Sequence, residues 1–214
     1  MIKIESFTFN PFSENTYILY DESKECIIID AGCYDIREQN ELVNFIQTNN
    51  LKPVKLINTH SHIDHVLGNK FISDKYKIPL YLNKEDLEGL KQAHIYGTMW
   101  GINMQPSPMP DSYLEDGDTL TFGNSDLQVF FTPGHSPGSV SFYSDKDGFV
   151  ISGDVLFQMS IGRTDLPGGD FDTLINSIRQ KLYTLPDKTI VYSGHGEPTT
   201  IGFEKLNNPF VNKK

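Results

Sequence analysis

The stretch His60-Ser61-His62-Ile63-Asp64-His65 places four side chains that can bind a metal ion within six positions. It directly follows Pro53-Val-Lys-Leu-Ile-Asn-Thr59, a short apolar run that is typical of a buried strand. A strand that ends at such a cluster holds it in a loop at the edge of a sheet, where a metal ion and a substrate can both reach it. A solvated loop is a poor alternative, because three of the six histidines of the chain lie in this one stretch.

Three later polar residues each follow a glycine at the end of an apolar run: His135 in Thr-Pro-Gly-His, Asp154 in Ser-Gly-Asp and His195 in Ser-Gly-His. Taken alone, they are more typical of a loop histidine or a turn aspartate. Beside the first cluster, they favour a metal site instead. Imidazole and carboxylate groups are good zinc ligands, and a carboxylate can offer one oxygen to each of two ions. The whole set indicates a site for two metal ions and, with it, hydrolysis.

The composition restricts the class of protein. The chain has 214 residues, which predicts one domain over residues 1–214 with a sizeable core. Its formal net charge of −10, from 18 Lys and Arg against 28 Asp and Glu, argues against a general affinity for nucleic acid or an anionic membrane surface. The start is unlike a secretory signal and no apolar run is long enough for a membrane span, which predicts a cytoplasmic protein.

Cys26 and Cys33 are the only cysteines and are expected to be free thiols.

The apolar pattern predicts an α+β fold of two packed sheets with helices outside. Residues 90–110 show no regular pattern and are expected to form a long loop or a broken helix, of the kind that often acts as a lid or binding loop. The predicted strands are 2–9, 15–20, 25–30, 54–58, 78–82, 119–122, 126–132, 139–144, 148–152 and 189–192, and the predicted helices are 35–48, 66–76 and 172–182.

The motifs His-x-His-x-Asp-His, Thr-Pro-Gly-His, Gly-Asp and Gly-His occur in this order, and in this the chain resembles the metallo-β-lactamase-fold superfamily. The resemblance implies a four-layer αββα sandwich with the site at one edge of the sheets. It also implies two divalent metal ions, most often zinc, with iron or manganese as alternatives. By the same resemblance, His60, His62 and His135 would bind the first ion, Asp64, His65 and His195 the second, and Asp154 would bridge them.

Further roles follow from the resemblance and from sequence position. Asp64 and Asp154 would be the catalytic carboxylates, acting together with a metal-bound hydroxide. Asp30, which closes the run Ile-Ile-Asp, is either a turn residue or an acceptor that orients a histidine ligand. Lys91 is a candidate for the substrate pocket, whereas His94 is expected to be an ordinary histidine of a mobile loop.

Within that superfamily, the run Gly162-Arg-Thr-Asp165 after Gly-Asp-Val-Leu-Phe is similar to the glyoxalase II-like branch, which hydrolyses 2-hydroxyacyl thioesters of glutathione. The chain resembles the short members of this branch, because it ends soon after His195 and is expected to lack the C-terminal helical domain that grips glutathione. A small-molecule thioester or ester is therefore the expected substrate. The predicted substrate-binding residues are Arg163, Asp165, Tyr96 and Trp100.

Two alternatives use the same scaffold. A persulfide dioxygenase has a similar fold and also carries a Gly-Arg-Thr-Asp run, and it would hold a single iron on His60, His135 and Asp154. A lactonase or phosphodiesterase would use the whole set of ligands. The thioesterase is favoured because Ser-Pro-Gly-Ser after His135 is typical of the hydrolases. A binding module without catalysis is disfavoured, because every expected ligand is present. No pattern indicates the oligomeric state.

Overall fold

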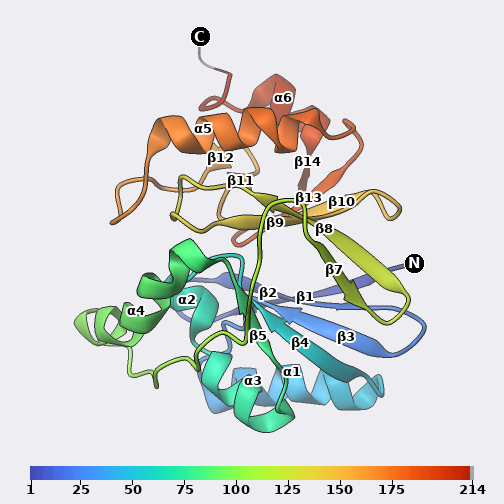
Figure 1. Cartoon of the computed structure of the whole chain (residues 1–214), viewed down its shortest axis with the longest axis vertical. Coiled ribbons are helices and arrows are strands. Elements are labelled where there is room, and N and C mark those ends of the chain that lie inside the picture. The colour runs from blue at the N-terminus through green and yellow to red at the C-terminus, as the bar shows by residue number, and fades with distance from the viewer. Residues whose placement is uncertain (213–214) are drawn as a thin grey trace.

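The computed structural model describes residues 1–212, in which two β-sheets pack face to face and helices cover both outer faces (Figure 1). Residues 213 and 214, which the predicted domain includes, lie outside the described part. The layers follow the order helix, sheet, sheet, helix. The predicted four-layer αββα sandwich is therefore confirmed.

The first sheet has the strand order β1-β2-β3-β4-β5-β6, and α1 and α3 cover its outer face (Figure 1). Its first three strands are antiparallel, and β3 to β6 are parallel. A capping box between Asp35 and Glu38 starts α1, which buries Leu42 and Ile46. The bounds are β1 Lys3–Phe9, β2 Glu14–Tyr20, β3 Glu25–Ile29, α1 Ile36–Thr48, β4 Lys52–Ile57, α2 Ile63–Val66, α3 Asn69–Tyr76, β5 Leu80–Leu82, a 3₁₀ turn Lys84–Asp86, α4 Leu87–Met99 and β6 Ser112–Tyr113.

The second sheet has the order β14-β13-β10-β9-β8-β7, and α5 and α6 cover it from the other side (Figure 1). Since β9 is antiparallel to both neighbours and β10 is parallel to β13, the strands β8, β10 and β13 run in the same direction. Asp170 caps α5 by accepting a hydrogen bond from the Thr173 amide. The bounds are β7 Thr119–Phe122, β8 Ser125–Phe131, β9 Val140–Ser144, β10 Phe149–Gly153, β11 Leu156–Phe157, β12 Ser160–Ile161, α5 Phe171–Gln180, a 3₁₀ turn Leu182–Thr184, β13 Ile190–Ser193, β14 Thr199–Thr200 and α6 Ile201–Asn207.

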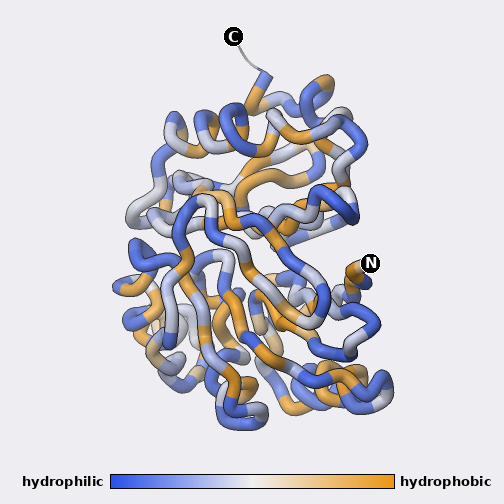
Figure 2. Tube along the Cα trace, turned by 45° about the vertical axis from the view of Figure 1, so that its right-hand side comes forward, coloured by the Kyte–Doolittle hydropathy of each residue, from blue (hydrophilic) through white to orange (hydrophobic). Residues whose placement is uncertain are grey.

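The central core lies between the sheets, where Ile27 and Ile29 of β3 belong to the same buried cluster as Phe142 of β9 and Ile151 of β10. Figure 2 shows hydrophobic stretches along these strands in the middle of the molecule. Both faces of β3 and β10 are covered, which explains why their sequences are continuous apolar runs rather than alternating ones. The polar residues that end these runs are thereby held at a fixed edge.

The predicted loop or broken helix over residues 90–110 is wrong in its first half. The helix α4 continues to Met99, and a loop follows only after it. The packed face of α4 carries small residues at a spacing of four, Gly89, Ala93 and Gly97, and a Cβ at Gly89 would collide with the Ser61 hydroxyl. Close packing on small residues replaces the bulky apolar stripe from which a helix is recognised in a sequence.

The helix predicted over residues 66–76 is found as α3, but it begins three residues later than predicted, and a separate short helix precedes it. A short α2 carries Asp64 and His65, and α3 begins only at Asn69. The break lies at Gly68, whose amide donates a 2.6 Å hydrogen bond to the carbonyl of Ala31. This contact fixes α2 against the end of β3, so both of its candidate ligands are held at the edge of the first sheet.

Both cysteines are free, as predicted, and the structure shows that both are buried. Burial raises the pKa of the Cys26 thiol to about 12 and also raises the pKa of Cys33. Neither thiol is therefore a thiolate at neutral pH, which argues against a nucleophilic or metal-binding cysteine.

Candidate metal centre

Loops from both sheets bring the seven predicted ligands together. Because β8, β10 and β13 run in the same direction, the loops that follow them meet at one edge of the second sheet. The loop after β4 reaches the same place from the first sheet. The contributions are His60 and His62 from the loop after β4, Asp64 and His65 from α2, His135 after β8, Asp154 after β10 and His195 after β13.

The first group consists of His60, His62 and His135, which each offer one nitrogen within 4.8 Å of the others. His62 Nδ1 lies 2.8 Å from His135 Nε2. Burial, together with the neighbouring His135, lowers the pKa of His62 to about 4, and burial holds the pKa of His60 well below its usual range. His60 and His62 are therefore neutral at physiological pH, which is the form of imidazole that binds metal ions.

The second group consists of Asp64, His65 and His195, again with one ligand atom each within 4.8 Å of the others. Asp64 Oδ2 lies 3.1 Å from His195 Nε2 and 3.6 Å from His65 Nε2. Burial opposes a positive charge on His195, but hydrogen bonds to Asp154 and Asp64 outweigh it and raise the pKa of His195 to about 10. The second group thus lies in a negative field that a cation would neutralise.

Asp154 lies between the two groups. Its Oδ1 is 3.4 Å from His65 Nε2, and its Oδ2 is 3.5 Å from both His135 Nε2 and His195 Nε2. Burial alone would raise the pKa of Asp154, but the neighbouring His65 and His195 hold it well below its usual range. One ionised carboxylate therefore faces members of both groups.

Asp30 orients two of the histidines from behind. Its Oδ2 accepts hydrogen bonds from His65 Nδ1 at 3.0 Å and from the Thr59 hydroxyl at 2.7 Å. Since that hydroxyl donates its proton to Asp30, it accepts the hydrogen bond from His60 Nδ1 at 2.9 Å. Both imidazoles then direct their other nitrogen, Nε2, toward the site. The geometry supports the acceptor role over the turn role for Asp30. Asp30, His60 and His65 also form a group that could hold an ion, but both oxygens of Asp30 already accept hydrogen bonds from Thr59 and His65.

Backbone carbonyls orient two more histidines in the same way. His135 Nδ1 donates to the Arg163 carbonyl at 2.7 Å, and His195 Nδ1 donates to the Ser13 carbonyl at 3.1 Å. Because a carbonyl only accepts, Nδ1 of each ring carries a proton and Nε2 is the nitrogen that faces the site. This link to Arg163 gives the Gly162–Asp165 run a structural role that the sequence did not indicate.

The residues present fit bound divalent metal ions. Among residues 1–212, three buried atoms that face the centre have no hydrogen-bond partner: His60 Nε2, His65 Nε2 and Asp154 Oδ1. An unpaired buried polar atom costs about 1–3 kcal/mol, so three at one place call for a common partner. Imidazole nitrogens and carboxylate oxygens together suit zinc, iron or manganese.

Sequence reasoning missed Glu14, a fully buried carboxylate beside the second group. Its Oε2 accepts a 2.9 Å hydrogen bond from Thr16, and its Oε1 has no such partner and lies 4.0 Å from His65 Nδ1. Burial raises its pKa well above the usual range. A Cβ at Gly32 would collide with this carboxylate, so the glycine after Asp30-Ala makes room for it. No motif marks Glu14, because it opens the buried strand β2 like an ordinary strand residue.

Asp86 was also missed. Its Oδ2 accepts from the Ser61 amide at 2.7 Å and the Ser136 hydroxyl at 3.0 Å, and its Oδ1 accepts from the Gly138 amide at 2.6 Å. The buried carboxylate therefore ties the loop of His60 to the loop of His135, across the two sheets. In the sequence, Asn83-Lys-Glu-Asp looks like a plain helix start, which hides this role.

A cavity of about 610 Å³ opens above the candidate centre. Of the predicted substrate-binding residues, Tyr96, Trp100 and Arg163 line it. Asp165 does not; it pairs with Arg163 through two hydrogen bonds of 2.7 and 2.8 Å. Lys91 is also outside the lining and pairs with Glu88 at 2.6 Å.

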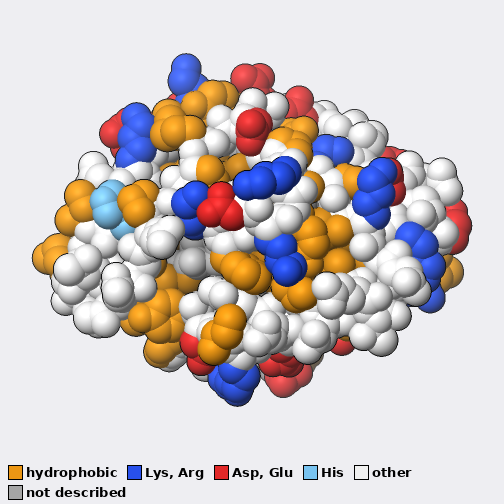
Figure 3. All heavy atoms as spheres, turned by 90° about the horizontal axis from the view of Figure 1, so that it is seen from below, with side chains coloured by type: hydrophobic (Ala, Val, Ile, Leu, Met, Phe, Trp, Pro, Cys, Tyr) orange, Lys and Arg blue, Asp and Glu red, His pale blue; other side chains and the backbone are white. Residues whose placement is uncertain are grey.

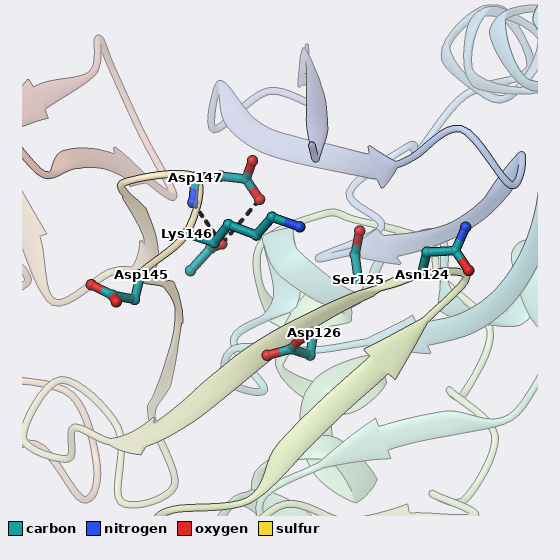
Figure 4. Close-up of a pocket in the computed structure, with 7 residues that line it drawn as sticks. Asn124, Ser125, Asp126, Asp145, Lys146 and Asp147 are labelled. Carbon is teal, nitrogen blue, oxygen red and sulfur yellow. Dashed lines mark hydrogen bonds between the residues drawn. The ribbon is translucent and has the colours of Figure 1, made fainter.

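A second hollow, of about 190 Å³, lies at the other end of β10 (Figure 4). Asp126, Asp145, Lys146 and Asp147 surround it, without a histidine. Mixed charge also marks the face formed by α1 and α3, where Lys and Arg are interspersed with Asp and Glu (Figure 3). The cavity at the His/Asp groups is thus the one that combines depth with reactive side chains.

Known proteins share this fold. The family model described as the Metallo-beta-lactamase superfamily matches residues 9–195. The chain belongs to the metallo-beta-lactamase superfamily. As a member of this superfamily of metallo-hydrolases, it is expected to bind metal at the His/Asp groups described above.

Two relatives match this metallo-beta-lactamase superfamily member over nearly its whole length. It is 40% identical over 203 residues to "Probable metallo-hydrolase YqgX" of Bacillus subtilis, with 94% of each chain covered. It is 34% identical over 215 residues to "Hydroxyacylglutathione hydrolase GloC" of Haemophilus influenzae, with 100% of each chain covered.

Solved structures in the superfamily match the fold closely. The structure described as BLEG-1 B3 metallo-beta-lactamase has a TM-score of 0.90 at 39% identity and 100% coverage of both chains. TTHA1623, described in a di-iron-bound form, has a TM-score of 0.87 at 38% identity, covering 96% of this chain and 99% of its own.

Within residues 1–212, no helix is both long and apolar enough to span a membrane.

Proposed function

We propose that this chain is a metal-dependent thioesterase of glyoxalase II type that hydrolyses a 2-hydroxyacyl thioester. The observation that carries the proposal is the convergence of two His/Asp groups at the floor of an open cavity. The full-length likeness to GloC, which is named a hydroxyacylglutathione hydrolase, supports the reaction class. The run Ser-Pro-Gly-Ser after His135, which is typical of the hydrolases, supports it over the dioxygenase.

The proposal assigns the ligands as follows. When bound, two divalent ions lower the pKa of water to about 7 and polarise a carbonyl oxygen. Zinc suits the donor set best, and iron or manganese are the alternatives. His60, His62 and His135 would hold one ion, Asp64, His65 and His195 the other, and Asp154 would contribute an oxygen to each.

The chain's own residues prepare the site for this chemistry. Burial would raise the pKa of Asp64, but His65 and His195 lower it, so that Asp64, like Asp154, stays ionised at neutral pH. Asp30 keeps a proton on His65 Nδ1 and, through Thr59, on His60 Nδ1, which prevents either ring from turning away. A substrate in the cavity would meet groups that are already oriented, so little reorganisation is needed.

The test is elemental analysis of protein purified without added metal, followed by a panel of small-molecule substrates. We expect about two metal ions per chain and hydrolysis of lactoyl thioesters with release of free thiol. If fully metal-loaded protein cleaves no thioester, the proposal is refuted. One bound iron with persulfide-dependent oxygen uptake would establish the dioxygenase instead, and preferred cleavage of a lactone or a phosphodiester would identify those activities.

Hydrolysis of a β-lactam is a second candidate function, and the substrate panel should include a β-lactam. BLEG-1, with 39% identity over the whole chain, is described as a B3 metallo-beta-lactamase. A β-lactam amide places a carbonyl at a metal pair much as a thioester does, so the same site would serve. Turnover of a β-lactam well above that of any thioester would replace the thioesterase proposal.

Two expectations from the sequence remain predictions. A single domain over residues 1–214 is tested by limited proteolysis, which should yield one resistant fragment. A cytoplasmic location is tested by cell fractionation.

A further inference from the structure

One wall of the cavity above the metal centre is apolar and comes mainly from α4. Ala93, Tyr96 and Trp100 line it, and the Phe12 ring meets the Trp100 ring edge-on with centroids 6.3 Å apart. Trp100 is 64% exposed although it is the largest side chain of the wall. An exposed aromatic pair beside a reactive centre is available to pack against an apolar part of a substrate.

The facing wall is also apolar, and it is rigid. Pro137, Leu166 and Pro167 line it. The Gly169 amide donates to the Leu166 carbonyl at 2.9 Å, which closes a turn, and the Asp170 amide donates to the Gly134 carbonyl at 2.8 Å. The cavity is therefore a slot between two apolar walls whose floor is the metal centre.

The charges around this slot are negative or already paired. Glu85 and Glu88 line its rim, and Glu88 is paired with Lys91, which lies outside the lining, at 2.6 Å. Within the described part of the chain, Arg163 is the only Lys or Arg of the lining, and its guanidinium is engaged with Asp165 through two hydrogen bonds. A carboxylate on the substrate would meet the two glutamates and would have to displace Asp165 to gain an arginine partner.

We infer that the thiol half of the substrate is apolar and uncharged, an aliphatic or aromatic thiol rather than a peptide thiol with several carboxylates. The inference rests on the proposed thioesterase function. In this arrangement the acyl carbonyl lies over the floor, and the leaving sulfur points into the slot between Trp100 and Leu166. The reaction balances without a further reactant: the hydroxyl group of water adds to the carbonyl carbon, the C–S bond breaks, and the sulfur leaves as a thiolate that takes up the remaining proton of that water to give the free thiol.

The experiment compares a matched pair of lactoyl thioesters, one of benzyl mercaptan and one of 4-(mercaptomethyl)benzoate, with lactoylglutathione as a third substrate. The first two differ only by a carboxylate, and each rate is divided by the hydroxide-catalysed rate of the same ester. We expect kcat/KM for the benzyl ester to exceed both others by about tenfold or more, because its ring is buried without a charge. Equal or faster cleavage of either charged ester overturns the inference but leaves the thioesterase proposal intact. Cleavage of none of the three by metal-loaded enzyme rejects the thioesterase proposal itself.

A charge-reversal variant sharpens the result. Glu88→Lys should raise the ratio of kcat/KM for the carboxybenzyl ester to kcat/KM for the benzyl ester by about two- to fivefold, since an exposed charge pair is worth little. Glu41→Lys is the matched control, because this substitution makes the same change in net charge. Glu41 is an exposed residue of α1 and lies outside the cavity lining. An equal effect of both variants would show that the rim does not select against charge.

Discussion

The floor of the cavity and its walls are built in opposite ways. On the floor, His60 and His65 are 0% exposed, and hydrogen bonds to Thr59 and Asp30 fix their rings. On the walls, Tyr96 is 41% exposed and Trp100 64%. A buried hydrogen-bonded ring has one orientation, whereas an exposed side chain has several.

This difference separates the two tasks of the site. Under the proposed function, the floor would hold the groups for a reaction that many substrates share, and a change there would affect metal binding and every substrate alike. The walls would decide which substrate fits, and a change there would affect affinity for some substrates only. The predictions below test this division, from the floor outward.

Asp154→Ala should have the largest effect, because it removes the carboxylate that faces both His/Asp groups. We expect activity toward all substrates to fall by more than about 100-fold, beyond the 10- to 100-fold range typical of residues that only support a ligand. Bound metal, measured by elemental analysis, should fall with it. Asp126→Ala in the second hollow is the control for the same substitution at an exposed site. Full activity of the Asp154 variant would refute the bridging role.

Asp30→Asn tests the layer behind the ligands. Asp30 has a φ of 53°, a conformation that asparagine also adopts, so the exchange strains the backbone little. An amide offers one acceptor oxygen where the carboxylate accepts from His65, the Thr59 hydroxyl and the Thr59 amide. We expect metal affinity, measured by chelator competition, to drop about 10- to 100-fold. Unchanged affinity would mean that Asp30 is merely a turn residue.

The same division explains what the sequence revealed. The cluster His60–His65 is visible because four ligand types crowd one loop, and the later ligands because Gly-His and Gly-Asp end apolar runs. The fold followed from these runs, since β3 and β10 are buried on both faces. The structure brings all seven side chains together, and their role as ligands stays a prediction.

The residues that position this floor were not predictable in the same way. Glu14 and Asp86 act across the fold, and each lies far along the chain from the groups that it contacts. The wall helix α4 was hidden for a different reason, because it packs through Gly89 and Gly97. A sequence pattern records neither a contact made across sheets nor a close approach of backbones.

Asp86→Asn should have a smaller, mainly structural effect. The carboxylate accepts from the amides of Ser61 and Gly138, and an asparagine can serve only one of them well. A buried amide without a partner costs about 1–3 kcal/mol, which should appear in the free energy of unfolding measured in denaturant. Metal affinity should fall a few-fold as well, because the loops of His60 and His135 lose their link. Glu85→Gln, at the exposed neighbouring residue, is the control. If the Asp86→Asn variant binds metal as tightly as the Glu85→Gln variant, the loops hold their positions without Asp86.

Tyr96→Phe should have the smallest effect, because Tyr96 lies on the wall of the cavity. It removes only the hydroxyl, which donates to Gln92 Oε1 at 2.8 Å on the exposed side of α4, and it keeps the ring that lines the cavity. A hydrogen bond between exposed groups contributes at most about 1 kcal/mol, so kcat should stay the same and KM should change less than about fivefold. Bound metal should remain that of the unaltered protein, in contrast to the floor variants. A loss of metal or a large fall in kcat in Tyr96→Phe would erase the separation between floor and wall, because a group on the exposed helix would then control the buried ligands.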